Sequence, residues 1–299
     1  MNEVTKEYKL RIVQSINENA FKFTTNKAHA VSIGIDPAQY SRVLAGETEG
    51  VLSDKKWMLI ASKYNVPATA DEFVWKAARN TAVYKYIYKQ LESCQRMSIS
   101  GIFCDIADIG KTFTARDYVK EHRNAILIDC SLHKSRTQFL RAMAKEWGID
   151  HQIPLRILRN DLIQYMNSMT TPIVVCDEFG DLNYPAFLEV KSLWNATEYR
   201  TAWYMMGADG LSAKLDRNKA NKKVGYAEIF SRLGSKYQRI TPIGEQERKK
   251  FLLHEIARIL KANESKYTPL EMYAKTFGSL RRVFFEIKKE KTITTTQNE

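Results

Sequence analysis

Residues 105–112 place a lysine and a threonine in an arrangement suited to binding phosphate. The segment follows an apolar run at 99–104 and precedes an amphipathic helix expected from Phe113 to about Glu121. A phosphate loop has the pattern G-x-x-x-x-G-K-[S/T] between a strand and a helix. Its backbone N–H groups hold the phosphates, its lysine neutralises their charge and its hydroxyl holds Mg²⁺. We therefore expect a site for ATP and Mg²⁺, with Thr112 at the metal, made by these residues: Asp105, Ile106, Ala107, Asp108, Ile109, Gly110, Lys111, Thr112 and Phe113.

Two aspartates make this loop unusual. Asp105 stands where the pattern has its first glycine, and Asp108 adds a second carboxylate within the loop. Aspartate tolerates the left-handed backbone that such a turn requires. A carboxylate close to a triphosphate lowers the affinity for nucleotide unless a cation or an N–H group compensates for its charge. Three interpretations follow: normal binding with the carboxylates turned away, weak binding, or a loop that has lost its nucleotide.

An acidic pair, Asp177 and Glu178, follows the apolar run 172–176. In a nucleotide site, Asp177 would be a metal ligand, and Glu178 would be the catalytic base that orients and deprotonates the attacking water. An Asp-Glu pair after a strand is also a common helix N-cap. The loop and the acidic pair occur in the order that a nucleotide site requires, with one further strand between them. This order favours the nucleotide site.

Short β-rich runs alternate with amphipathic helices from Ser98 onward. The runs lie at 99–104, 125–129, 173–176, 202–206 and 237–240, and helices are expected between them near 134–147, 153–169 and 184–200. Strands separated by helices of this length indicate parallel β-α units. We therefore predict an α/β fold with a central parallel sheet that is covered on both faces.

The rest of the chain is expected to be mostly helical. The predicted divisions are an all-α domain at 1–66, a helical connector at 67–97, the α/β core at 98–242, a C-terminal helical lid at 243–291 with helices at 245–262 and 269–289, and a flexible polar tail at 292–299.

The N-terminal domain has the pattern of a helix-turn-helix. A helix at 28–35 ends near Gly34, and a second helix follows with Asp36 as its N-cap and Pro37 in its first turn. The second helix of such a motif enters the major groove of DNA. The side chains expected to face outward are Gln39, Tyr40 and Arg42. The domain carries nine Lys and Arg against seven Asp and Glu, so a packing module or a protein-contact domain remains the alternative.

A more basic region lies between Lys214 and Arg239. It holds eight cations and two acids, so its own net charge is half of the formal net charge of +12 of the whole chain. A basic chain favours polyanionic partners, and each lysine that meets a DNA phosphate releases counterions. The candidate phosphate contacts are Lys214, Lys219, Lys222 and Lys223; the alternative is a solvated loop.

Other sequence features limit the cellular setting. No apolar run approaches the roughly 20 residues that span a bilayer, and the polar N-terminus is no signal peptide. The four cysteines show no Cys-x-x-Cys pair, so we expect them to be reduced core residues rather than a zinc site or a disulfide. We expect a cytoplasmic protein without membrane contact.

Later segments match landmarks of AAA+ ATPases. Arg232, at 230–233, lies between the fourth and fifth runs, where these proteins carry an arginine finger, and 278–282 lies at the place of the sensor-2 arginine. The fourth run leads into the sensor-1 place, where Asp209 stands in for the usual polar residue. In this order of features, the chain resembles the MuB-type transposition proteins, which are AAA+ ATPases related to the IstB and TnsC proteins.

The resemblance implies a function and residue roles. MuB-type proteins form ATP-dependent filaments on target DNA and deliver it to a transposase. The implied partners are double-stranded DNA, a transposase and further copies of the chain in a ring or helical filament. Arg232 would reach the nucleotide of a neighbouring subunit, or form a surface salt bridge. Arg281 or Arg282 would contact the γ-phosphate of the chain's own nucleotide, and the other would contact DNA or solvent.

Two other functions remain open from the sequence. One is a replicative-helicase loader of the same fold, whose N-terminus would bind a helicase. The other is a DNA-binding regulator in which an inactive nucleotide site serves only as a scaffold. Replacement of Glu178 by Gln separates this regulator from the ATPases, because only an ATPase depends on that carboxylate.

Overall fold

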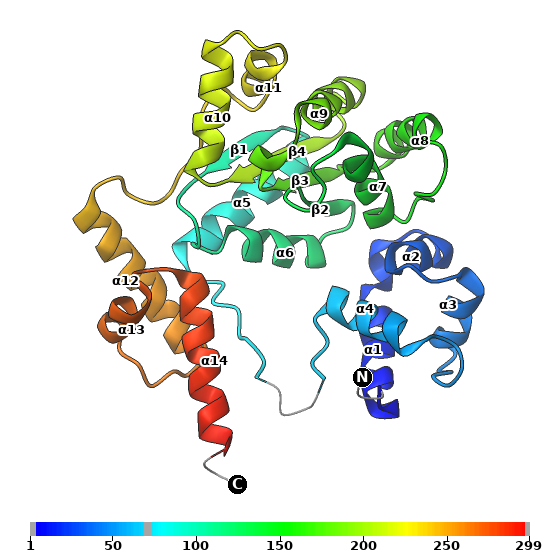
Figure 1. Cartoon of the computed structure of the whole chain (residues 1–299), viewed down its shortest axis with the longest axis horizontal. Coiled ribbons are helices and arrows are strands. Elements are labelled where there is room, and N and C mark those ends of the chain that lie inside the picture. Colours follow the sequence, from blue (N-terminus) through cyan, green and yellow to red (C-terminus); the bar gives the residue numbers. More distant parts are fainter. Residues whose placement is uncertain (1–3, 69–72, 297–299) are drawn as a thin grey trace.

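The computed structural model describes residues 4–68 and 73–296, with side chains described as far as residue 292. A parallel sheet with helices on both faces lies at its centre (Figure 1). Four N-terminal α-helices gather on one side of this core, and three C-terminal helices gather on the other. No helix in these described ranges is long and apolar enough to cross a membrane.

The sheet contains four parallel strands in the order β1-β4-β3-β2. Their bounds are β1 Gly101–Cys104, β2 Ala125–Asp129, β3 Ile173–Asp177 and β4 Ala202–Gly207. All four follow predicted runs closely. Because parallel strands place their carboxyl ends at one edge, the loop after β1 and the acidic pair after β3 meet there.

The fifth predicted run, 237–240, is not a strand. Gln238 forms a single parallel bridge with Phe103. The next backbone N–H groups, those of Ile240 and Thr241, donate to the carboxylate of Asp105. A side chain therefore takes the place of the strand carbonyls that would have continued the ladder, and the sheet ends at β1.

Helices cover both faces of the sheet, as predicted. Along β4, Trp203 and Met205 join the core on one face, while Tyr204 and Met206 join the core on the other. The first face packs against α7 Arg136–Glu146, α8 Leu155–Ser168, α9 Tyr184–Ala196, α10 Asp209–Ala220 and α11 Tyr226–Arg232. The second packs against α5 Ala82–Met97 and α6 Lys111–Glu121. The strands are buried on both sides, which explains their continuous apolar sequence.

Among the described residues of the connector, the helix is confined to the second half. Residues 73–78 are not helical, and α5 begins at Ala82 with Thr81 as its N-cap; the earlier part of this prediction, at 69–72, falls outside the described residues. The non-helical stretch carries Phe73 and Trp75, whose rings pack against Phe284. Burial of these rings against the C-terminal helices outweighs local helix propensity.

The N-terminal helices surround their own hydrophobic core. Their bounds are α1 Lys6–Asn19, the short 3₁₀ helix η1 Ala20–Lys22, α2 Asn26–Ile33, α3 Pro37–Leu44 and α4 Asp54–Tyr64. Gly34 adopts a left-handed conformation at the end of α2, and Asp36 caps α3. The expectation that Tyr40 faces outward is wrong: its side chain is buried and hydrogen-bonds to His29 Nδ1 at 2.7 Å.

The C-terminal helices are α12 Glu245–Ala262, α13 Pro269–Thr276 and α14 Leu280–Thr296. The single helix predicted at 269–289 is broken, because Phe277 and Gly278 have left-handed φ angles of 51° and 82°. Helix α14 continues through the first five residues of the predicted flexible tail, whose last three residues lie outside the described part.

Candidate nucleotide site

The loop after β1 ends at the bare N-terminus of a helix. Gly110 is the N-cap of α6 with φ 94°, and no side chain caps this end. Asp108 is also left-handed, with φ 61°, as aspartate can be. The first N–H groups of a helix have no partner within it, and together with the helix dipole they form an anion-binding site.

Lys111 lies inside this loop. It is 6% exposed, and its Nζ donates to the carbonyl oxygens of Asp105 at 2.9 Å and Ile106 at 2.6 Å. Burial lowers the pKa of Lys111, while the nearby carboxylates of Asp105, Glu178, Asp177 and Asp209 act to raise it. The lysine is thus a buried cation whose hydrogen bonds go to neutral carbonyls, and phosphate oxygens are stronger partners for it.

Thr112 and Asp177 meet at the carboxyl edge of the sheet. The threonine Oγ1 donates to Asp177 Oδ2 at 2.6 Å. Asp177 is 3% exposed; burial raises its pKa, and the hydrogen bond from Thr112 lowers it. The two predicted metal ligands therefore reach the same point in space. Their types, a hydroxyl and a carboxylate, suit Mg²⁺, which prefers oxygen ligands.

Glu178 follows directly and is exposed, with a left-handed φ of 47°. Partial burial raises the pKa of its carboxyl, the charge of Asp177 raises it further, and Lys111 opposes both effects. Asp129, a site residue that was not predicted from the sequence, pairs in register with Asp177 and also raises the pKa of both acids. The available signal was the same as for Asp177: an apolar run that ends in aspartate.

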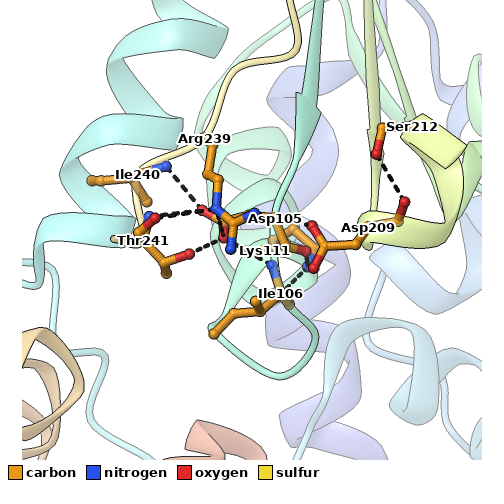
Figure 2. A network of polar contacts seen from close by, with 8 residues as sticks. All are labelled: Asp105, Ile106, Lys111, Asp209, Ser212, Arg239, Ile240 and Thr241. Atoms are coloured by element: carbon orange, nitrogen blue, oxygen red, sulfur yellow. Dashed lines mark hydrogen bonds and ion pairs between the residues drawn. The ribbon is translucent and has the colours of Figure 1, made fainter. Parts of the chain in front are cut away.

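Asp105 directs its carboxylate toward Ile240 and Thr241 (Figure 2). It is fully buried, and its carboxylate accepts hydrogen bonds from the N–H groups of Ile240 at 2.9 Å and Thr241 at 3.0 Å. The Thr241 hydroxyl also donates to it, and Arg239 Nε lies 3.5 Å away. Asp105 thus anchors the segment after α11 to the loop, and its charge is compensated by these donors.

Asp108 reaches the C-terminal helices instead. Its carboxylate accepts a hydrogen bond from Ser279 Oγ at 3.0 Å and pairs with Arg281 Nε at 3.1 Å. Its carbonyl accepts from the N–H of Leu280 at 2.9 Å. The structure therefore brings Arg281 to the phosphate loop. Arg282 faces a different place, an open groove of about 710 Å³.

Several other candidate residues contact groups within the chain. The guanidinium of Arg232 lies over the ring of Trp194, 4.8 Å from its centroid. Asp209 pairs with Arg239 at 3.4 Å. Within the loop, Ile109 belongs to the core, whereas the ring of Phe113 is 40% exposed. Nη1 of Arg232 is buried and has no hydrogen-bond partner among the described residues.

The candidate DNA-contacting side chains differ in whether they already have partners within the chain. Gln39 Nε2 donates to the carbonyl of Val51, and Arg42 pairs with Glu47 at 2.8 Å. Lys214 donates to the carbonyls of Gly180 and Leu182, and burial lowers its pKa.

Two lysines of the basic region lie on aromatic rings. Lys219 Nζ is 3.4 Å from the ring centroid of Phe230, and Lys223 Nζ is 4.3 Å from that of Tyr184. Lys222 and Arg217 are exposed. These two cations are free to meet a phosphate backbone.

The parallel sheet, the loop at the start of α6 and the acidic edge of β3 define the AAA+ P-loop fold. A protein family described as an AAA domain matches residues 101–215, a span that contains the loop and the acidic pair. Such a domain indicates a nucleotide-binding ATPase, and the predicted α/β fold class is confirmed.

A similar protein from a prophage was also found. The chain is 24% identical over 252 residues to the Mu-like prophage FluMu DNA transposition protein B of Haemophilus influenzae. The aligned region covers 83% of this chain and 85% of that protein. The similarity thus extends well beyond the AAA domain, into the helices on either side.

Proposed function

We propose that this chain is an ATPase of DNA transposition that binds ATP and Mg²⁺, assembles on double-stranded DNA and delivers that DNA to a transposase. The observation that carries the proposal is the contact of Thr112 with Asp177 at 2.6 Å, beside the buried Lys111 at the start of α6. The similarity to a DNA transposition protein B supports the biological setting.

The nucleotide would be held by the loop and by the helix that follows it. Lys111 would exchange the carbonyls of Asp105 and Ile106 for phosphate oxygens, and the N–H groups at the start of α6 would donate to the same phosphates. The carboxylates of both loop aspartates are turned to other donors: that of Asp105 is buried, and that of Asp108 pairs with Ser279 and with Arg281, which it would share with the phosphates. Of the three interpretations, this favours normal binding with the carboxylates turned away.

Thr112 and Asp177 would hold Mg²⁺ together with phosphate oxygens. Within the described residues, no three His, Cys, Asp or Glu side chains are grouped to hold a metal alone. That agrees with a Mg²⁺ site, since this ion is commonly held by one or two protein oxygens together with phosphates and water. When bound, the ion would neutralise charge that develops on the phosphates.

Glu178 would act as the catalytic base. Its exposure gives its carboxylate access to water, and its position next to Asp177 would place it beside the phosphates of a bound nucleotide. Its raised pKa improves its strength as a proton acceptor. Arg232 would have to leave Trp194 to serve a neighbouring subunit; its position supports this role less than that of Glu178.

Binding and hydrolysis can be tested with the purified protein. We expect fluorescent ATP to bind in the presence of Mg²⁺, and electron microscopy to show a coat on duplex DNA only when ATP is present. Glu178→Gln should still bind ATP but hydrolyse it about a hundredfold or more slowly, and should remain on DNA. Glu228→Gln, which removes an exposed carboxylate paired with Lys191, is the matched control.

The outcomes separate the proposed function from its alternatives. No ATP binding at millimolar nucleotide would exclude the ATPase. Normal DNA assembly by Glu178→Gln with unchanged lifetime would favour a regulator with an inactive site. ATP-dependent binding of a replicative helicase, with no coat on duplex DNA, would favour a helicase loader.

A further inference from the structure

The phosphate loop and the last helix of the chain are joined through one residue, Asp108. Its carboxylate contacts Ser279 Oγ and Arg281 Nε, and its carbonyl accepts from the N–H of Leu280. These three contacts all involve the first turn of α14 or the residue before it. The negative charge of Asp108 also lies at the positive end of the dipole of α14.

This contact is accessible to solvent. The side chain of Asp108 is 32% exposed and that of Arg281 is 71% exposed. Ion pairs with such exposure contribute little stability and exchange easily for other partners. A phosphate carries more charge than a carboxylate, and, like a carboxylate, it can accept two parallel hydrogen bonds from a guanidinium.

A second connection between the C-terminal helices and the core has the opposite character. Glu255 of α12 is fully buried, and its two oxygens accept from the N–H groups of Ala82 and Val83, each at 2.9 Å. Arg258 also pairs with it at 2.7 Å. Breaking a buried, fully paired carboxylate is costly. Among the contacts of the described residues, the C-terminal helices therefore have a buried connection at the start of α5 and a solvent-accessible one at the phosphate loop.

We propose that Asp108 is a positioning residue that holds Arg281 and the start of α14 on the loop, and that nucleotide phosphate displaces it. Phosphate bound in the loop repels the carboxylate of Asp108 and attracts the guanidinium of Arg281. Arg281 then changes partner, and α14 loses its contact with Asp108 while α12 stays fixed at Glu255. This inference rests on the proposed function, because it needs nucleotide in the loop.

Two substitutions test this change of partner, because they should act on nucleotide affinity in opposite directions. Asp108→Asn removes the carboxylate that competes with phosphate, so the affinity for ATP should rise about three- to tenfold. Arg281→Gln removes a phosphate contact, so the affinity should fall by about tenfold. A purely structural role of Asp108 would not tighten ATP binding. Glu286→Gln and Lys288→Gln, which change charges elsewhere on α14, are the matched controls.

Hydrogen exchange of α14 gives the second measurement. In the native protein, amides in the first turn of α14 should exchange faster with ATP than without it. In Asp108→Asn, the same amides should exchange fast both with and without ATP. In Ser279→Ala, their exchange without ATP should also be faster than in the native protein, but by less. Without nucleotide, the effects of Asp108→Asn and Arg281→Gln on exchange should be non-additive, because the two residues form one contact.

Failure of the proposed change of partner of Arg281 can be distinguished from failure of the proposed function. If the native protein binds ATP but Asp108→Asn leaves affinity and α14 exchange unchanged, or weakens binding as Arg281→Gln does, the role of Asp108 is overturned and the ATPase stands. If the native protein binds no ATP, the proposed function fails, and the proposed change of partner of Arg281 fails with it.

Discussion

The two aspartates of the phosphate loop show how a departure from a motif can be explained by partners far away in sequence. Asp105 replaces a glycine and binds the segment at 239–241, and Asp108 binds the start of α14. A glycine at either position would provide the turn but not the connection. The loop is thus a junction between three parts of the chain as well as a phosphate site.

Restoring the motif glycine at Asp105 should harm the protein. Asp105→Gly leaves the buried N–H groups of Ile240 and Thr241 without an acceptor, so we expect a loss of about 3 kcal/mol in the free energy of unfolding and no gain in ATP affinity. Urea denaturation and ATP titration measure the two quantities. Asp209→Asn, which alters a 58% exposed side chain with one long ion pair, should cost less than about 1 kcal/mol. A glycine variant that is as stable as the native protein would contradict this role.

The pH dependence of hydrolysis should report the raised pKa of Glu178. The base works when it is deprotonated, so kcat should fall as the pH falls through this pKa, at a pH above the range of an ordinary glutamate. Steady-state measurements of kcat from acidic to neutral pH show this fall, which is the acidic limb of the pH profile. Glu178→Gln should remove both most of the rate and this limb. A limb retained at reduced rate would assign the titration to another group, such as Asp177.

The sequence predicted the parts of the site that depend on local spacing. Lys111, Thr112 and Asp177 belong to short segments whose strand and helix context can be read from the chain. The partners of the loop aspartates could not be predicted, since they are more than 130 residues away. Nor could spacing alone decide between Arg281 and Arg282; the position of the α13–α14 turn decides it.

At the level of elements, the strands and the helices of the core were predictable because their periodicity reflects burial on one or both faces. The errors occur where a tertiary contact overrides a local preference. Asp105 ends the ladder at Gln238, the packing of Phe73 and Trp75 keeps their segment non-helical, and two left-handed residues divide 269–289. None of these contacts leaves a pattern within its own segment.

The most basic segment of the chain runs from Lys214 to Arg239, through the end of α10, the turn after it and α11, and its exposed cations should contribute to DNA affinity. Replacing Arg217 and Lys222 together by Gln should weaken duplex binding about equally for all sequences and reduce the slope of log affinity against log salt by about two. Filter binding at several salt concentrations measures this slope. Replacing Lys85 and Lys120 together by Gln removes two exposed cations outside the basic region and is the matched control. An unchanged slope would mean that DNA contacts lie elsewhere.

Across the whole molecule, the N-terminal helices are docked on the α/β core rather than merely tethered to it. Lys63 pairs with Glu146 at 3.1 Å and also donates to the carbonyl of Ser32. Gly148, just after α7, approaches the backbone of Ala28 so closely that a β-carbon at this position would overlap the Ala28 carbonyl. This docking places α2 against the core and leaves α3 on the far side (Figure 1).

Gly148→Ala should therefore undock these helices. The substitution combines two costs, a left-handed φ of 72° and the overlap with Ala28, whereas Gly34→Ala has the same backbone strain, φ 76°, with open space around it. Both variants should lose about 1 kcal/mol from strain, but only Gly148→Ala should expose α2 and α7. Hydrogen exchange of these helices, with small-angle scattering of the whole chain, distinguishes the two. If DNA affinity rises on undocking, the docked position restrains the helix-turn-helix; if both variants retain native exchange in α2 and α7, the Ala28–Gly148 contact does not control the position of the N-terminal helices.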